Sequence, residues 1–144
     1  MILADMARVD NGKLYVLGGG WNVASASAPS AIGILIEVPW AQTGTKHRLE
    51  LELLTGDGQD AVDPDGQPMV HFDTEFEAVR PPGVLLGVPA SGCLAFNFPP
   101  LPLQPGTRYR WQLSIDGQTN PDWEVGFSTI AAAVRIASCP APEI

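Results

Sequence analysis

The sequence has few basic residues and no long hydrophobic run. Its 144 residues include 8 Lys and Arg against 16 Asp and Glu, which gives a formal net charge of −8. Binding to nucleic acid or anionic lipid depends on clustered Lys and Arg, so this balance argues against both partners. No apolar run approaches the roughly 18 residues of a membrane-spanning helix. The N-terminus has no basic region and carries Asp5 among its first apolar residues, unlike a secretory signal. We therefore expect a cytoplasmic protein that binds neither nucleic acid nor membrane.

Cysteine is scarce, and the common catalytic motifs are missing. In a reducing compartment Cys93 and Cys139 are expected to be free thiols, and the apolar setting of Cys93 favours an inert buried one. The sequence has no GxSxG, HExxH or CxxC, and one of its two histidines, His71, falls among acids on the polar face of its segment. Glu75 and Glu77 share a strand face, which would suit glycoside chemistry, but solvated strand faces commonly carry such pairs. We predict no catalytic residues and a protein that is not an enzyme.

The triple glycine Gly18–Gly20 follows a strand-like segment, as phosphate-binding loops do. A dinucleotide fingerprint would need a third glycine at Val23 and a helix after it, and a P-loop would need a lysine where Trp21 stands. Neither requirement is met. We predict that the glycines end a strand by permitting positive φ, a bulge or a close backbone approach, and that the protein binds no nucleotide cofactor.

No segment keeps a helical period, and 15 glycines with 14 prolines would interrupt one. Alternation of apolar and polar residues dominates instead. In HRLELELLT, Leu49, Leu51 and Leu53 fall on one face and the charged side chains on the other, the pattern of a strand with one buried side. Three further segments alternate in the same way: 69–78, 108–116 and 122–128. Four more are apolar and less regular: Ile2–Val9, Lys13–Gly19, Ala31–Trp40 and Cys93–Phe98.

These segments indicate about eight strands separated by turn residues. Many short strands at this spacing predict an all-β fold, namely a two-sheet antiparallel β-sandwich, immunoglobulin-like or jelly-roll-like, with a barrel as the alternative. We expect one domain over residues 1–130. Its predicted core comprises the inward residues of the strands: Leu49, Leu51, Leu53, Phe72, Phe76, Phe96, Tyr109, Trp111, Leu113, Val125 and Phe127.

One loop, DGQDAVDPDGQP, crowds four carboxylates between two strands: Asp57, Asp60, Asp63 and Asp65. Carboxylate oxygens are the ligands that calcium prefers, so these residues are candidates for a metal site. The spacing of an EF-hand fails, however. When Gly66 is aligned with the invariant glycine, Ala61 stands at the first ligand position and Phe72 replaces the bidentate glutamate. A solvated hairpin loop without metal is the favoured interpretation.

The four tryptophans fall into two pairs. Trp111 and Trp123 occupy the buried phase of their strands and are predicted to lie in the core. Trp21 and Trp40 stand at strand ends, where an exposed indole can stack on a sugar ring. We therefore treat Trp21 and Trp40 as candidate ligand-binding residues, with the requirement that they lie side by side in a concave surface.

The last segment, residues 131–144, is a mainly apolar extension whose only charges are Arg135 and Glu143. A solvated tail is normally polar, so we expect this one to be buried. It can add a strand to its own sheet, or it can cross to a neighbouring copy and make a homo-oligomer by strand exchange.

Six stretches of the chain occur in a recognisable order: LAD, GKLYVLGGGW, IEVPW, HRLELELLTGDG, VRPPG and LPLQPGTRYRWQLSIDG. Together they resemble a family of small bacterial proteins, frequent in actinobacteria, that is catalogued only as a domain of unknown function. The resemblance covers approximately Leu3 to Phe127. It implies a cytoplasmic, single-domain β-sandwich and brings no known catalytic residues. LQPGTRYRWQL is also similar to a turn and strand of immunoglobulin-like bacterial domains, although the paired cysteines of antibody domains are missing.

Two classes of function follow from these observations. The first is a non-enzymatic protein-interaction or self-assembly module that uses a sheet surface or an edge strand. The second is a ligand-binding sandwich that contacts carbohydrate or calcium through the loop tryptophans or the acidic loop. We favour the first, because ordinary strand and turn chemistry accounts for the candidate ligand residues.

Overall fold

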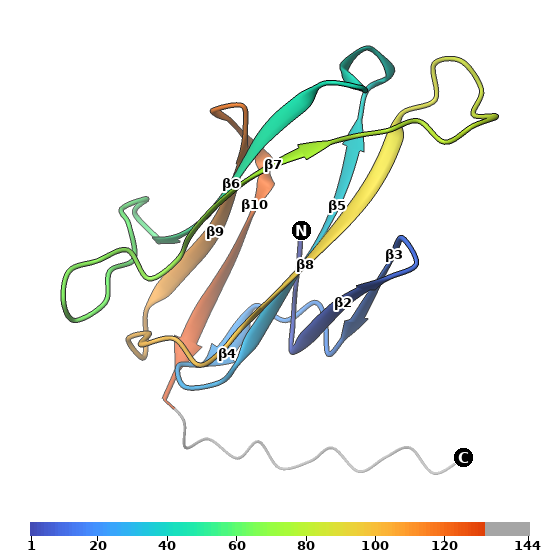
Figure 1. Cartoon of the computed structure of the whole chain (residues 1–144). Helices are drawn as coiled ribbons and strands as arrows, with labels where there is room; N and C mark the ends of the chain where they lie inside the picture. The colour runs from blue at the N-terminus through green and yellow to red at the C-terminus, as the bar shows by residue number, and fades with distance from the viewer. Residues whose placement is uncertain (132–144) are drawn as a thin grey trace, which may run out of the picture.

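The computed structural model describes residues 1–131 and contains ten strands within that range (Figure 1). One short 3₁₀ helix, η1 (Trp40–Gln42), follows β5, and no α-helix occurs among the described residues. The strands are β1 (Ile2–Ala4), β2 (Met6–Asp10), β3 (Lys13–Leu17), β4 (Val23–Ser25), β5 (Ser30–Val38), β6 (Lys46–Thr55), β7 (His71–Glu77), β8 (Ala90–Phe98), β9 (Arg108–Ile115) and β10 (Gln118–Ile130). The prediction of an all-β fold is confirmed. The sequence predicts that the C-terminal extension is buried, but residues 132–144 of this extension lie outside the described residues. Cys139 is among them.

The strands form three sheets. A five-stranded sheet has the order β4-β10-β9-β6-β7, a three-stranded sheet has the order β1-β5-β8, and β2 and β3 form a separate hairpin. All strand pairs are antiparallel except β10 with β4, which is parallel. The predicted division into two sheets with about eight strands is therefore not confirmed. The hairpin makes a third sheet, and the short strand β4 has no apolar alternation that would reveal it in the sequence.

The predicted strand Ile2–Val9 is two strands, because the chain changes sheets at Asp5. Residues before Asp5 pair with β5, and residues after it pair with β3. The backbone N–H of Asp5 donates to the carbonyl of Leu17 at 3.1 Å. Gly18 has a positive φ of 61°, and a Cβ at this position would overlap the Asp5 carboxylate. The first glycine of the triple therefore ends β3 and allows a close approach, as the sequence predicted.

The main core lies between the five-stranded and three-stranded sheets. Most of the predicted inward residues are buried there, and Trp111 is 1% exposed and stacks on Phe98 with ring centroids 4.8 Å apart. The alternation predicted for β6 is confirmed, since Leu49, Leu51 and Leu53 are all buried. Phe72 is the exception to the predicted core. It is 38% exposed because β7 is the outermost strand of its sheet, although its ring contacts Phe96 at 4.8 Å.

The β2–β3 hairpin lies over the outer face of the three-stranded sheet (Figure 1). Small side chains make this contact possible. A Cβ at Gly33 of β5 would come within 2.9 Å of Leu14 Cδ2 in β3. The Asn97 side chain of β8 joins the hairpin to the sheet, because its Nδ2 donates to the Ala7 carbonyl at 2.8 Å and its Oδ1 accepts the Ala7 N–H at 3.0 Å. The buried residues of this second cluster are Ala4, Ala7 and Ala31.

Candidate functional site

The acidic loop between β6 and β7 is organised by its own hydrogen bonds. The Asp57 carboxylate accepts the Thr55 hydroxyl, which lowers the pKa of Asp57 below its usual range. Asp63 Oδ1 accepts the backbone N–H groups of Asp65 and Gln67, both at 2.9 Å. Within residues 1–131, the four loop carboxylates form no group of three whose ligand atoms are close enough for one ion. The structure thus uses two of the four candidate metal ligands, Asp57 and Asp63, to shape turns.

Trp21 and Trp40 lie at opposite ends of the long strands. Trp21 packs edge-on against Phe127, with centroids 5.9 Å apart, near the pairing of β10 with β4. Trp40 begins η1 at the end of β5, where the Arg80 guanidinium lies 3.8 Å from the centre of its ring. Arg80 Nε also donates to Thr43 Oγ1 at 2.6 Å. The two candidate ligand residues therefore do not form one concave aromatic surface.

Cys93 was predicted to be a buried thiol, and the structure places it half-buried on β8. Side chains alternate along β8, so Leu94 and Phe96 point into the core whereas Cys93 faces the β2–β3 hairpin. The Sγ atom of Cys93 lies 3.5 Å from the Gly12 carbonyl.

A cleft of about 230 Å³ lies beside Cys93, between the end of β7 and the start of β8. Its lining is largely apolar and includes Ile36, Val38, Phe76, Val79, Cys93 and Leu94.

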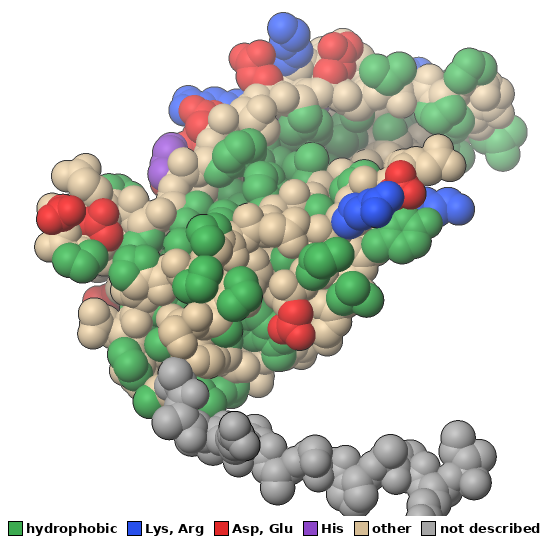
Figure 2. Space-filling view, turned by 60° about the horizontal axis from the view of Figure 1, so that its bottom comes forward, with side chains coloured by type: hydrophobic (Ala, Val, Ile, Leu, Met, Phe, Trp, Pro, Cys, Tyr) green, Lys and Arg blue, Asp and Glu red, His purple; other side chains and the backbone are tan. Residues whose placement is uncertain are grey.

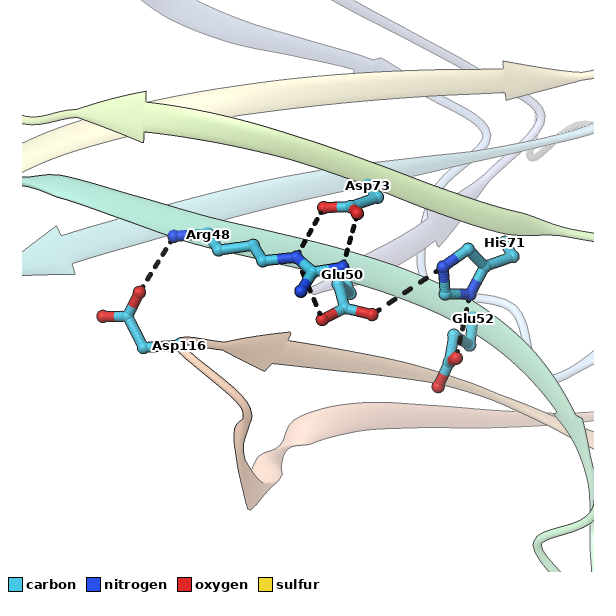
Figure 3. Close-up of polar contacts among 6 residues, drawn as sticks. All are labelled: Arg48, Glu50, Glu52, His71, Asp73 and Asp116. Carbon is cyan, nitrogen blue, oxygen red and sulfur yellow. Dashed lines mark hydrogen bonds and ion pairs between the residues drawn. The ribbon is translucent and has the colours of Figure 1, made fainter.

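Charged side chains gather on the outer face of the five-stranded sheet, which we call the polar face (Figure 3). Its members alternate with the core residues of their strands. Strand register places Glu50 opposite Asp73, and Glu52 opposite His71. The residues drawn from β6 and β7 are Arg48, Glu50, Glu52, His71 and Asp73.

Arg48 lies beside two carboxylates of the polar face. Its Nε and Nη2 donate to the two oxygens of Asp73 at 3.0 and 2.6 Å, and its Nε also lies 3.4 Å from Glu50 Oε1. The hydrogen bonds between Arg48 and Asp73 lower the pKa of Asp73 and raise the pKa of Arg48. A two-pronged Arg–carboxylate pair of this kind holds both groups in a defined orientation.

The imidazole of His71 lies between two carboxylates of β6. Its Nδ1 is 2.9 Å from Glu52 Oε1, and its Nε2 is 3.7 Å from Glu50 Oε2. The two glutamate side chains are only 19% and 29% exposed, for Glu50 and Glu52 respectively. One ligand atom from each of the three residues lies within 4.8 Å of the others. The sequence identified His71 as a surface histidine beside acids, but did not connect it with β6.

The second histidine, His47, is buried at the start of β6 and belongs to a different cluster. Its Nδ1 lies 2.7 Å from Asp116 Oδ2, and its Nε2 lies 2.8 Å from the Gln42 carbonyl. Both neighbours are acceptors, so the doubly protonated ring satisfies them together. The hydrogen bond with Asp116 raises the pKa of His47, and the same bond lowers the pKa of Asp116. Sequence reasoning missed this pair because no local signal links a strand residue to a distant turn.

The outer face of the β2–β3 hairpin is apolar and exposed, and we call it the hairpin face. Met6, Tyr15 and Leu17 are 48%, 53% and 62% exposed. Arg8 and Asp10 stand beside them and form an ion pair of 3.3 Å. These five residues line a shallow groove of about 340 Å³. Figure 2 shows that hydrophobic side chains reach the surface at many places on one side of the molecule.

The fold and these surfaces define an all-β protein with one charged sheet face and one apolar hairpin face. The chain belongs to a family of unknown function (DUF6941), whose model matches residues 1–125. The resemblance to a domain of unknown function that the sequence motifs indicated is thus confirmed. No curated protein matches the chain. In the described residues there is no helix with the length and apolar character needed to cross a membrane.

Proposed function

We propose that the protein is a non-enzymatic interaction module that associates with a second copy of itself through the hairpin face. The observation that carries this proposal is the exposure of Met6, Tyr15 and Leu17 side by side on paired strands. Met6 is opposite Leu17 in the register of the hairpin, and Tyr15 is two residues before Leu17 on the same strand. Removing neighbouring apolar side chains from water stabilises an association in proportion to the area covered.

The edge of the hairpin supports a second copy as the partner. Within residues 1–131, β2 is the only strand that pairs with β3, so the other edge of β3 can accept a further strand. Two β3 strands related by a two-fold axis would pair antiparallel and join the hairpins into one sheet. Tyr15 and Leu17 of the two copies would then contact one another across the new strand pair and remove part of each other's apolar surface from water.

The charges of the hairpin also favour self-association over a strongly charged partner. Arg8 and Asp10 balance each other beside the apolar groove. An acidic or basic partner would gain little from this nearly neutral face.

The test is the mass of the full-length protein in solution, measured by light scattering over a range of concentrations. We expect a dimer that becomes monomeric when Tyr15→Ser and Leu17→Ser are combined. Leu86→Ser is the matched control, because Leu86 is 86% exposed in the loop between β7 and β8. A wild-type protein that is monomeric at every concentration would overturn the proposal. A dimer that dissociates only when residues 131–144 are deleted would instead assign association to the C-terminal extension.

The alternative function, binding of carbohydrate or calcium through the loop residues, has less support. Arg80 covers the ring of Trp40, and Trp21 packs against Phe127 at the far end of the molecule. Asp57 and Asp63 are engaged in turn hydrogen bonds. Neither arrangement presents a surface prepared for a ligand, so self-association remains our proposal.

A further inference from the structure

We propose that Glu50 and His71 of the polar face bind a divalent transition-metal ion of the Zn²⁺ type, with Glu52 holding the imidazole in place. The ion lies between Glu50 Oε2 and His71 Nε2, and water completes its coordination. This site is separate from the acidic loop and from the hairpin face, and it does not depend on self-association.

The distance between the two ligand atoms carries the argument. Glu50 Oε2 and His71 Nε2 are 3.7 Å apart, which is too long for a hydrogen bond. Two ligand atoms that are each about 2.0–2.2 Å from one tetrahedral Zn²⁺ ion are about 3.3–3.6 Å apart, only slightly closer than these two atoms. The gap between these atoms is therefore suited to a shared ion, and only small side-chain rotations are needed.

Glu52 supplies the support that a metal-bound histidine needs. The other ring nitrogen, Nδ1 of His71, is 2.9 Å from Glu52 Oε1. A histidine that binds a metal through one nitrogen commonly donates the N–H of the other nitrogen to a carboxylate, which fixes the tautomer and the ring orientation. With Nδ1 protonated by this contact, Nε2 has its lone pair directed away from Glu52 and available to the ion.

The scaffold holds the three residues on neighbouring strands. Glu50 and Glu52 are two apart on β6 and so share a face, and His71 is directly opposite Glu52 in β7 (Figure 3). Both glutamate side chains are largely covered, which reduces the entropy lost when they are fixed on an ion. β7 is the edge strand of its sheet, and its His71 is exposed, so an ion can reach the site from solvent.

The charges around the site are compatible with a dication. Arg48 lies close to Glu50, but it contacts the other oxygen, Oε1, and its charge is balanced by Asp73 through two hydrogen bonds. Glu50 and Glu52 together place two negative charges near the ion, which balance its double positive charge. The mixed nitrogen and oxygen ligands favour Zn²⁺, Co²⁺ or Ni²⁺ over Ca²⁺ and Mg²⁺, which prefer oxygen alone.

The two histidines of the chain allow a direct test by NMR. On addition of Co²⁺ to the full-length protein, we expect the ring protons of His71 to broaden and shift strongly, because the ion binds its Nε2. The ring protons of His47 serve as an internal control, since both of its nitrogens are engaged by Asp116 and Gln42. Equal effects on the two histidines, or no effect on His71, would overturn the proposal.

Calorimetric titration with ZnCl₂ tests the role of each residue. We expect one ion per chain for the wild type and no saturable binding for His71→Asn or Glu50→Gln. Glu52→Gln should weaken binding about 10- to 100-fold, as found for residues that orient a metal ligand. Glu75→Gln is the matched control, because Glu75 is on the same face of β7 but pairs with Lys46. Binding that survives His71→Asn, or that is lost in a Cys93→Ser, Cys139→Ser variant, would refute the site.

Discussion

Nδ1 of His47 lies 2.7 Å from Oδ2 of Asp116, although the two residues are 69 positions apart in the chain. Asp116 follows β9 directly, and its other oxygen accepts the backbone N–H of Arg48 at 2.9 Å. The carboxylate therefore ties the start of β6 to the turn after β9. The hydrogen bond joins a buried imidazole to a partly exposed acid, so its strength depends on the protonation of both groups.

We expect the His47–Asp116 pair to stabilise the protein over a limited pH range. The folded pKa of His47 is raised, so its contribution is complete below the ordinary histidine value of about 6.5 and is lost as the pH rises through the folded pKa. The folded pKa of Asp116 is lowered, so its contribution is present above the ordinary value of about 3.9 and is lost as the pH falls through the folded pKa.

Thermal unfolding of the wild type and of His47→Gln across this pH range measures the effect. The difference in Tm should be largest between about pH 4 and 6.5 and should shrink at higher pH. Asp116→Asn provides the control, since it removes the charge while keeping a side-chain oxygen. A difference in Tm that stays constant with pH would show that the pair contributes no protonation-dependent stability.

Trp111→Ala should lower the free energy of unfolding by about 3–5 kcal/mol, because it removes a large, fully buried side chain that stacks on Phe98. Urea denaturation followed by circular dichroism measures this change. Trp111→Phe, which retains an aromatic ring at the centre of the core, should cost less. Equal losses for the two variants would indicate that the stacking on Phe98 does not matter.

Asn97→Ala should loosen the hairpin from the three-stranded sheet. The substitution leaves the N–H and carbonyl of buried Ala7 without the partners that Asn97 supplies, at a cost of about 1–3 kcal/mol. Hydrogen exchange at the Ala7 amide should become faster than exchange in the core of β6. Asn97→Asp retains the acceptor and should preserve part of the protection. Unchanged exchange at Ala7 in the alanine variant would contradict this account.

The acidic loop should respond to loss of a hydrogen-bond acceptor and not to calcium. Asp63→Ala removes the oxygen that accepts the N–H groups of Asp65 and Gln67, and should cost about 1 kcal/mol. Asp63→Asn keeps an oxygen in the same position and should cost less. The Tm of the wild type should not rise when CaCl₂ is added. A calcium-dependent increase in Tm that is lost in both variants would establish a metal site in this loop.

The strand interiors were predictable because they depend on neighbours in the sequence. Leu49, Leu51 and Leu53 alternate with charged residues, and a strand with this pattern can bury only one face. The interruption at Asp5 was not predictable, since it depends on β1 and β2 pairing with different strands. Nor did the sequence reveal the parallel pairing of β4, which is three residues long and depends on the position of β10.

The sequence by itself determined which residues face the core and which face solvent on most strands, and thereby the all-β class. It also placed Glu50 and Glu52 on one solvent face, because side chains two apart in a strand point the same way. Only the tertiary structure decided that His71 stands opposite Glu52, that His47 meets Asp116, and that one face of the hairpin is exposed within residues 1–131. The physical reason is that side-chain direction is a local property of the strand. The choice of partner strand and register is decided by contacts between residues far apart in the chain.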